Sequence, residues 1–161
     1  MIKVIKHENM GRSDRGWLHS LFHFSFAEYY KPDNIKFGAL RVVNDDRFDP
    51  HGGFGMHPHD NMEIISYVVD GQLTHRDNLG NGSRLERGDV QYMSAGSGIM
   101  HSEYNDTNEP CVSCRYGSCL TRRTRSRTMA TTASTGRTAW GSGCPSPRAR
   151  RVSRLSGSIR I

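Results

Sequence analysis

Two short motifs place side chains that can bind a metal ion at alternate positions of the chain. The segment GMHPHDNMEIIS contains His57 and His59, separated by Pro58, and the segment IMHSEYN contains His101 and Glu103. In a β-strand, residues i and i+2 point to the same side, so each pair can converge on one point. If the two strands face each other inside a barrel, three imidazoles and one carboxylate meet. Such a set suits a divalent transition metal and leaves room for water, dioxygen or a substrate oxygen.

A single His-x-His pair is a weak indication of a metal, because paired histidines also occur on ordinary protein surfaces. The second pair, in a separate predicted strand, makes metal binding the favoured interpretation. Glu63 could be a further ligand, or it could contact a metal-binding imidazole and orient it. The remaining histidines show no such pairing, and we interpret them as ordinary polar or packing positions: His7, His19, His23, His51 and His75.

The elements that must position these side chains are short strands joined by turns. NMEIISYVVDGQLTHRDNLGNGSR has the clearest hairpin pattern, with strand formers on both sides of the turn pair Asp70-Gly71. LERGDVQYMSAGSGIMHSEYN adds two strands around a glycine-rich corner, and GWLHSLFHFSF can form another. In FGALRVVNDDRF an apolar run leads into a predicted turn at residues 44–46. Without any sustained helical period, this pattern predicts an all-β sandwich or barrel.

Charge is distributed unevenly along the 161 residues, a length that predicts one domain. Residues 1–110 contain all 16 acidic residues, all 8 histidines and 11 basic residues, which gives a net charge of −5. Residues 111–161 contain 11 arginines, all four cysteines and no acidic residue. The N-terminus lacks the apolar core of a signal peptide and no apolar run approaches membrane-spanning length, so we expect a cytoplasmic protein without a membrane partner.

The stretches GFGMHPHDNMEIISYVVDGQLTHRDNLGN and LERGDVQYMSAGSGIMHSEYN resemble the N-terminal domain of pirins and of the bacterial pirin-like quercetin dioxygenases, which belong to the cupin superfamily. The part from GDVQYMSAG to HSE is the most specific, and the resemblance covers roughly residues 1–110. It implies a mainly β fold, the cupin (jelly-roll) barrel. It also implies that the metal is held by the histidines of HPH and by the His and Glu of HSE, which are His57, His59, His101 and Glu103.

The resemblance further implies a metal-dependent dioxygenase that opens the ring of flavonols such as quercetin with both oxygen atoms of O2. Glu103 would be a ligand and, on detaching, the base that removes the substrate hydroxyl proton, whereas Glu63 would not be a ligand. The family's metal is usually iron, Fe(II) here, although the same residues suit nickel, copper, manganese or zinc. The alternative is a redox-sensing pirin-type regulatory protein without catalytic activity. A cupin with an unknown small-molecule substrate is a third possibility.

After Pro110 the sequence departs abruptly from the resemblance, which would continue with further strands and a second cupin domain. Residues 111–161 form a tail rich in Arg, Ser and Thr with almost no strand or helix pattern. The tail could bind phosphate backbones, and its cysteines could suggest a zinc knuckle. However, it offers no fourth zinc ligand at a recognised spacing and few aromatic residues for base stacking, so we do not expect nucleic-acid binding.

For this tail we favour a shift of reading frame near codon 110. With one choice of codons, PCVSCRYGSC read two nucleotides later becomes VRFLQIWIM, a strand of the kind that pirins carry after HSE. On this hypothesis residues 111–161 are non-native, and the barrel is incomplete, with an open edge beside the metal site and impaired activity. The coding DNA tests it, because an alternative frame should continue as a full-length pirin-like protein.

Overall fold

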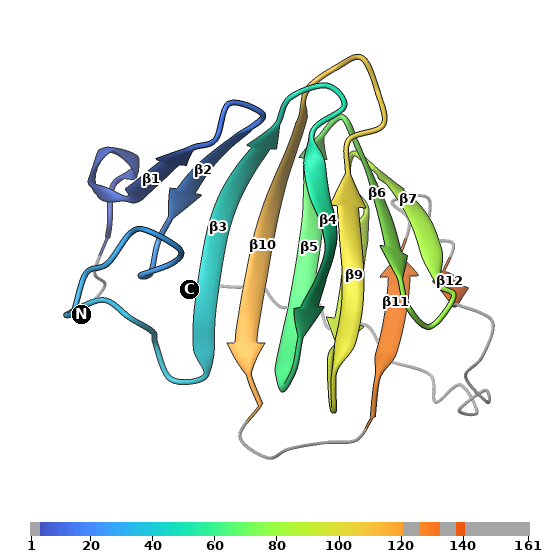
Figure 1. The fold of residues 1–161 in the computed structure, drawn as a ribbon. Coiled ribbons are helices and arrows are strands. Elements are labelled where there is room, and N and C mark those ends of the chain that lie inside the picture. Colours follow the sequence, from blue (N-terminus) through green and yellow to red (C-terminus); the bar gives the residue numbers. More distant parts are fainter. Residues whose placement is uncertain (1–3, 121–125, 133–137, 141–161) are drawn as a thin grey trace, which may run out of the picture.

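The computed structural model describes residues 4–120, 126–132 and 138–140, which form two antiparallel β-sheets (Figure 1). The larger sheet contains β1 (Gly11–Asp14), β2 (Leu18–Phe22), β3 (Leu40–Phe48), β5 (Met62–Asp70), β8 (Val90–Ser94), β10 (Cys111–Cys119), β11 (Thr128–Thr132) and β12 (Thr138–Trp140). Its strand order is β1-β2-β3-β10-β5-β8-β11-β12. The smaller sheet contains β4 (Gly53–His59), β6 (Gln72–Asp77), β7 (Gly82–Glu86) and β9 (Ile99–Tyr104), in the order β4-β9-β6-β7.

Helical structure in the described part of the chain is limited to one 3-10 turn, His7–Asn9. No described helix has the length and apolar character needed to cross a bilayer. The mainly β class expected from the sequence is therefore confirmed. Among the described strands the two sheets stay separate and do not close into one hydrogen-bonded barrel.

A hydrophobic core joins the two sheets because alternate residues of the strands point inward. In β5, Ile64 and Val68 are buried whereas Ile65 and Tyr67 are exposed. One buried cluster combines residues of both sheets: Leu18, Phe48, Val68, Leu73, Leu85 and Cys111. A second cluster lies near the start of β5 and β9 and contains Ile64, Met93, Ala95 and Ile99. These clusters hold the inner faces of the two sheets against each other.

The turn expected at residues 44–46 is wrong, because these residues lie inside β3. Two of the three polar side chains that suggested a turn, those of Asn44 and Asp46, point into the protein, whereas that of Asp45 is exposed. Asn44 and Asp46 are buried, and Ser20 Oγ donates a 2.5 Å hydrogen bond to Asp46 Oδ1. Burial of polar residues with partners is compatible with a strand, although the composition alone favours a turn.

The structure also corrects the expectation that regular structure is almost absent after Pro110. Cys111–Cys119 form β10, which pairs with β3 on one side and with β5 on the other. The expected open edge at this position is therefore filled by the chain's own residues. Strand pairing uses backbone groups that every residue except proline provides, so this segment can occupy a central position without an apolar sequence pattern.

Candidate metal centre

The predicted metal-binding motifs lie on two neighbouring strands of the smaller sheet. β4 and β9 are antiparallel, with His57 directly opposite His101 and His59 opposite Ile99. The register is irregular between Phe54 and His57, a place where a strand can redirect its side chains. From the sequence, two strands that face each other across a barrel were expected. The strands are instead hydrogen-bonded side by side, so cross-strand pairing within one sheet brings the motifs together.

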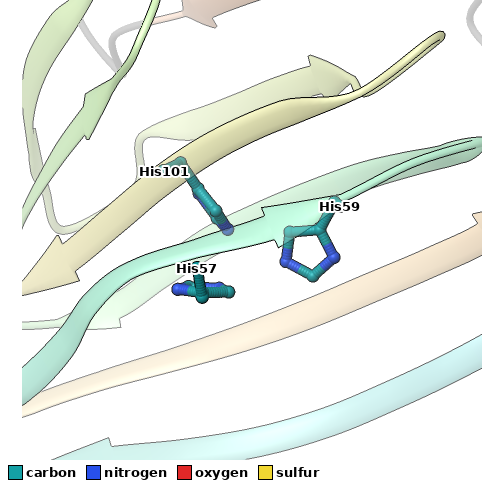
Figure 2. A group of neighbouring side chains, drawn as sticks. All are labelled: His57, His59 and His101. Atoms are coloured by element: carbon teal, nitrogen blue, oxygen red, sulfur yellow. The ribbon is translucent and has the colours of Figure 1, made fainter.

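Three imidazoles gather on the inner face of this strand pair. Figure 2 shows His101 of β9 reaching toward the two histidines of β4. The ring of His57 lies 4.3 Å from that of His101, and the ring of His59 lies 4.9 Å from each of the other two. One potential ligand atom from each residue lies within 4.8 Å of the others. Among the described residues, these three form the group that can hold a metal ion.

The free nitrogens of these imidazoles fit a metal ligand set. His57 Nδ1 lies 2.8 Å from the carbonyl oxygen of Gly55, to which it donates, so in the neutral ring Nε2 carries the lone pair. The Nε2 atoms of His59 and His101 are buried and have no hydrogen-bond partner among the described residues. Buried polar atoms are normally paired, so two unpaired imidazole nitrogens at one place indicate a missing ligand. A divalent transition metal can supply that partner.

Burial keeps two of the three imidazoles neutral, as metal ligation requires. Removal from water, reinforced by the neighbouring His57, lowers the pKa of His59 to about 4. Burial also lowers the pKa of His101 to about 3, even though the nearby Glu103 carboxylate opposes this shift. Near pH 7 both rings therefore offer a lone pair.

His75 is a part of this site that the sequence analysis did not identify. It is fully buried on β6, and its Nε2 lies 2.8 Å from Nδ1 of His101. If His101 Nδ1 donates this hydrogen bond, its Nε2 carries the lone pair that a metal needs. The interpretation of His75 as an ordinary polar or packing position leaves out this contact with His101. The alternation of β6 places His75 inward, but its contact with His101 depends on the pairing of β6 with β9.

Glu103 lies beside the histidines but outside their group of donor atoms. It is 1% exposed, and Arg115 Nη2 donates a 2.7 Å hydrogen bond to its Oε2. Ser66 Oγ lies 3.4 Å from its Oε1. Burial alone would raise the pKa of Glu103, but Arg115 and the nearby imidazoles outweigh burial and lower it to about 2. The carboxylate is therefore ionised, and its expected role as fourth ligand stays a prediction.

Arg115 is the second site residue that the sequence analysis did not identify. It points inward from β10 of the larger sheet and therefore crosses the space between the sheets to reach Glu103. Its Nη2 also lies 3.8 Å from Asp46 Oδ2, and its guanidinium carbon lies 5.4 Å from the centre of the Phe54 ring. No motif indicates this position, since the sequence presents Arg115 as one of many arginines in a basic tail.

The carboxylate of Glu63 has other partners. It accepts hydrogen bonds from the hydroxyl of Tyr92 and, at 2.7 Å, from Ser94 Oγ, both on the neighbouring strand β8. Along β5 it alternates with the inward-pointing Ile64. Glu63 is not among the residues whose donor atoms meet at the three histidines. The implication of the resemblance that Glu63 is not a ligand stays a prediction.

An open depression of about 650 Å³ borders the histidine group. Its lining includes His59, Met62, Ile99 and Met100. Apolar side chains next to an imidazole provide a surface on which a flat organic molecule can lie. The depression could therefore give a small molecule access to the site from the side of His59.

Comparison with known proteins places the chain in a family. The family model described as Pirin matches residues 4–115. A quercetin 2,3-dioxygenase of Escherichia coli K12 is 48% identical over 108 residues, which is 67% of this chain and 47% of the relative. A pirin-like protein of Caulobacter vibrioides is 60% identical over 98 residues, which is 61% of this chain and 42% of the relative. The chain thus spans less than half the length of these relatives.

The fold has a close counterpart among solved structures. The bacterial pirin YhhW of Escherichia coli in complex with nickel(II) superimposes with a TM-score of 0.76 at 40% identity. The alignment covers 78% of this chain and 55% of that protein. The expected cupin-like architecture of the family is confirmed by this agreement. Both the family match and the shared fold show that this chain belongs to the pirin family.

Proposed function

We propose that this chain is the metal-binding domain of a quercetin 2,3-dioxygenase-like pirin, which uses O2 to open the ring of a flavonol. The observation that carries the proposal is the group of three imidazoles from β4 and β9, with buried Nε2 atoms that lack a partner among the described residues. The names of relatives such as the quercetin 2,3-dioxygenase of E. coli support the reaction class.

In this proposal His57, His59 and His101 hold one divalent metal, with iron first and nickel, copper, manganese and zinc as alternatives. The E. coli pirin in complex with nickel(II) supports the binding of a divalent metal. A bound metal would supply a Lewis acid at which a deprotonated flavonol and O2 can react. His75 fixes the ring of His101 through their 2.8 Å contact, and so determines which nitrogen faces the site.

The substrate would approach through the depression beside His59, where Met62, Ile99 and Met100 can contact its rings. Glu103 is the carboxylate expected from the family resemblance to take the substrate hydroxyl proton. Since the pKa of Glu103 is lowered to about 2, it would accept that proton only if its contact with Arg115 weakened. The expected cytoplasmic location stays a prediction.

One observation favours a second candidate, a metal-binding regulatory pirin without catalytic activity. Arg115 engages the carboxylate that would act as the base. With its carboxylate paired to Arg115, Glu103 would not act as a base, and the site would not turn over a flavonol. The charge of the site could still change with the redox state of a bound metal.

The test combines metal analysis with oxygen uptake in the presence of quercetin. The dioxygenase proposal expects about one metal per chain, as is usual for sites built from three histidines. It also expects O2 consumption that disappears in His57→Ala. His51→Ala is the matched control, because His51 contacts Asn108 and is not part of the histidine group. Bound metal without turnover of any flavonol would favour the regulatory candidate, and absence of bound metal would overturn both.

A further inference from the structure

Glu103 is held from across the sandwich by a residue of the other sheet. Glu103 belongs to β9, and Arg115 belongs to β10, which lies between β3 and β5. Their side chains meet at 2.7 Å between Arg115 Nη2 and Glu103 Oε2. Charge-assisted hydrogen bonds of this length are among the strong ones in proteins.

The position of Arg115 is fixed on several sides. Asp46 Oδ2 lies 3.8 Å from the same Nη2 atom, and the ring of Phe54 lies beside the guanidinium group. The side chain of Arg115 is only 10% exposed, and that of Glu103 is 1% exposed. Moving Glu103 away from Arg115 would leave a buried guanidinium with the more distant Asp46 as its remaining acidic partner, which is strongly unfavourable in a site with little water.

The same contact accounts for the position of Glu103 relative to the imidazoles. Donor atoms of three histidines lie within 4.8 Å of one another, but neither oxygen of Glu103 joins this group. A residue at 115 with a neutral side chain would remove the partner that holds the carboxylate. Glu103, whose side chain lies beside the site, could then turn toward a bound cation.

We propose that Arg115 is a positioning residue that holds Glu103 out of the metal's ligand set, so that this chain binds a divalent metal through His57, His59 and His101 alone. The inference rests on the metal binding of the proposed function and specifies its ligands. Residue 115 thereby decides between a neutral three-histidine set and a set with an added negative charge.

A cycle of variants tests this assignment in the full chain. Nickel(II) affinity is measured by calorimetry, and the electron paramagnetic resonance spectrum is recorded with copper(II), for the unaltered chain, Arg115→Gln and Arg115→Gln/Glu103→Gln. In Arg115→Gln the freed carboxylate should tighten nickel binding about tenfold, the scale on which groups next to a metal site act. The double variant should return close to the affinity of the unaltered chain. Arg47→Gln is the control, since Arg47 pairs with Asp49 at an exposed position.

The copper spectrum separates ligation from a simple change of charge. The unaltered chain and the double variant should share one spectrum, and Arg115→Gln should differ from both because an anionic oxygen replaces a neutral ligand. A spectrum of the unaltered chain that matches Arg115→Gln would overturn the inference, because Glu103 would then already be a ligand. Identical spectra for all three proteins would overturn it as well. A chain that binds no nickel would overturn the proposed function and the inference together.

Loss of Arg115 leaves two buried acids, so Arg115→Gln could fail to fold. Circular dichroism checks this first. Arg115→Gln/Asp46→Asn then serves as the replacement, since it removes the second acid and leaves Glu103 free. A crystal structure of the unaltered chain soaked with nickel gives an independent measurement. It should show Glu103 on Arg115 and away from the ion, and a Glu103 oxygen bound to nickel would overturn the inference.

Discussion

The strands β9 and β10 follow each other in the chain and lie on opposite sides of the same site, yet their inner faces differ. The inward residues of β9 are Ile99, His101 and Glu103. The inward residues of β10 are Cys111, Ser113, Arg115 and Gly117. Thus β9 presents an apolar residue and two potential ligands, whereas β10 presents small residues and one long cation. Backbone pairing places both strands in their sheets, but the side chains of β10 change the chemistry of the site.

The reading-frame hypothesis offers a reason for this difference and stays a proposal. In the alternative reading VRFLQIWIM, the residues at positions 111, 113, 115 and 117 would be Val, Phe, Gln and Trp. Such residues would fill the sandwich more fully and would leave Glu103 without its cation. The substitution Arg115→Gln is therefore also the change that this reading makes. Sequencing the coding DNA across codons 105 to 125 should reveal an open alternative frame, and its absence refutes the proposal.

The largest effect is expected from breaking the contact between the two strands. Arg115→Leu removes the cation and leaves Glu103 and Asp46 buried without it, so we expect the free energy of unfolding to fall by about 3–5 kcal/mol. Urea unfolding of the metal-free chain measures this. Arg47→Leu, which removes an exposed ion pair, should cost about 0–1 kcal/mol. If the free energy of unfolding fell equally in the two variants, the Arg115 contact would stabilise the fold no more than an exposed ion pair does.

Acidification should destabilise the part of the protein that contains His59 of β4 and His101 of β9. The native pKa values of His59 and His101, about 4 and about 3, lie below the ordinary value of 6.5. At a pH between the native value and 6.5, the unfolded state therefore binds more protons than the folded state. Stability of the metal-free chain is therefore complete above pH 6.5 and falls as the pH decreases from about 6.5 to 4. Each extra proton contributes a slope of about 1.4 kcal/mol per pH unit.

Urea unfolding at several pH values in the presence of a chelator measures this slope. His59→Gln should reduce it by removing one of the buried imidazoles whose pKa is lowered, a set that also includes His75. The depressed pKa of Glu103, about 2, adds a further loss only below its ordinary value of 4.5. A stability that does not change between pH 6.5 and 4 would contradict the assignment of neutral, buried imidazoles.

A smaller effect is expected from replacing His75, which contacts His101. His75→Phe keeps a ring of similar shape but removes the contact to His101 Nδ1. Nickel affinity should fall about tenfold, because groups that orient a metal ligand have this influence. Calorimetry measures the change. His19→Phe is the control, since His19 contacts Asp14 and Asp49 and lies outside the group of three. An equal loss in both variants would exclude a specific role for His75.

The smallest effect concerns the packing of β10. Cys111 belongs to the same buried cluster as Leu85 of β7. Cys111→Ala removes one heavy atom and should cost about 1 kcal/mol, whereas Leu85→Ala should cost about 2–5 kcal/mol. Thermal and urea unfolding compare the two. A cost for Cys111→Ala as large as that for Leu85→Ala would show that β10 packs as tightly as strands with larger residues.

The sequence by itself determined the strand character of the first 110 residues and the three histidines that meet. Both results follow from local rules: alternation places His57 and His59 on one face, and the same rule places His101 with Glu103. The turn expected at residues 44–46 was wrong because composition does not reveal that Asp46 has a buried partner in Ser20.

Only the tertiary structure decided which strands are neighbours and, with them, the surroundings of the ligands. His75 contacts His101 because β6 pairs with β9, and Arg115 reaches Glu103 because β10 lies in the opposite sheet. Neither contact has a signature in the sequence, since the partners are 26 and 12 residues apart and belong to different strands. Side-chain periodicity is a local property of the backbone, whereas strand order and sheet packing depend on contacts between segments that are distant along the chain.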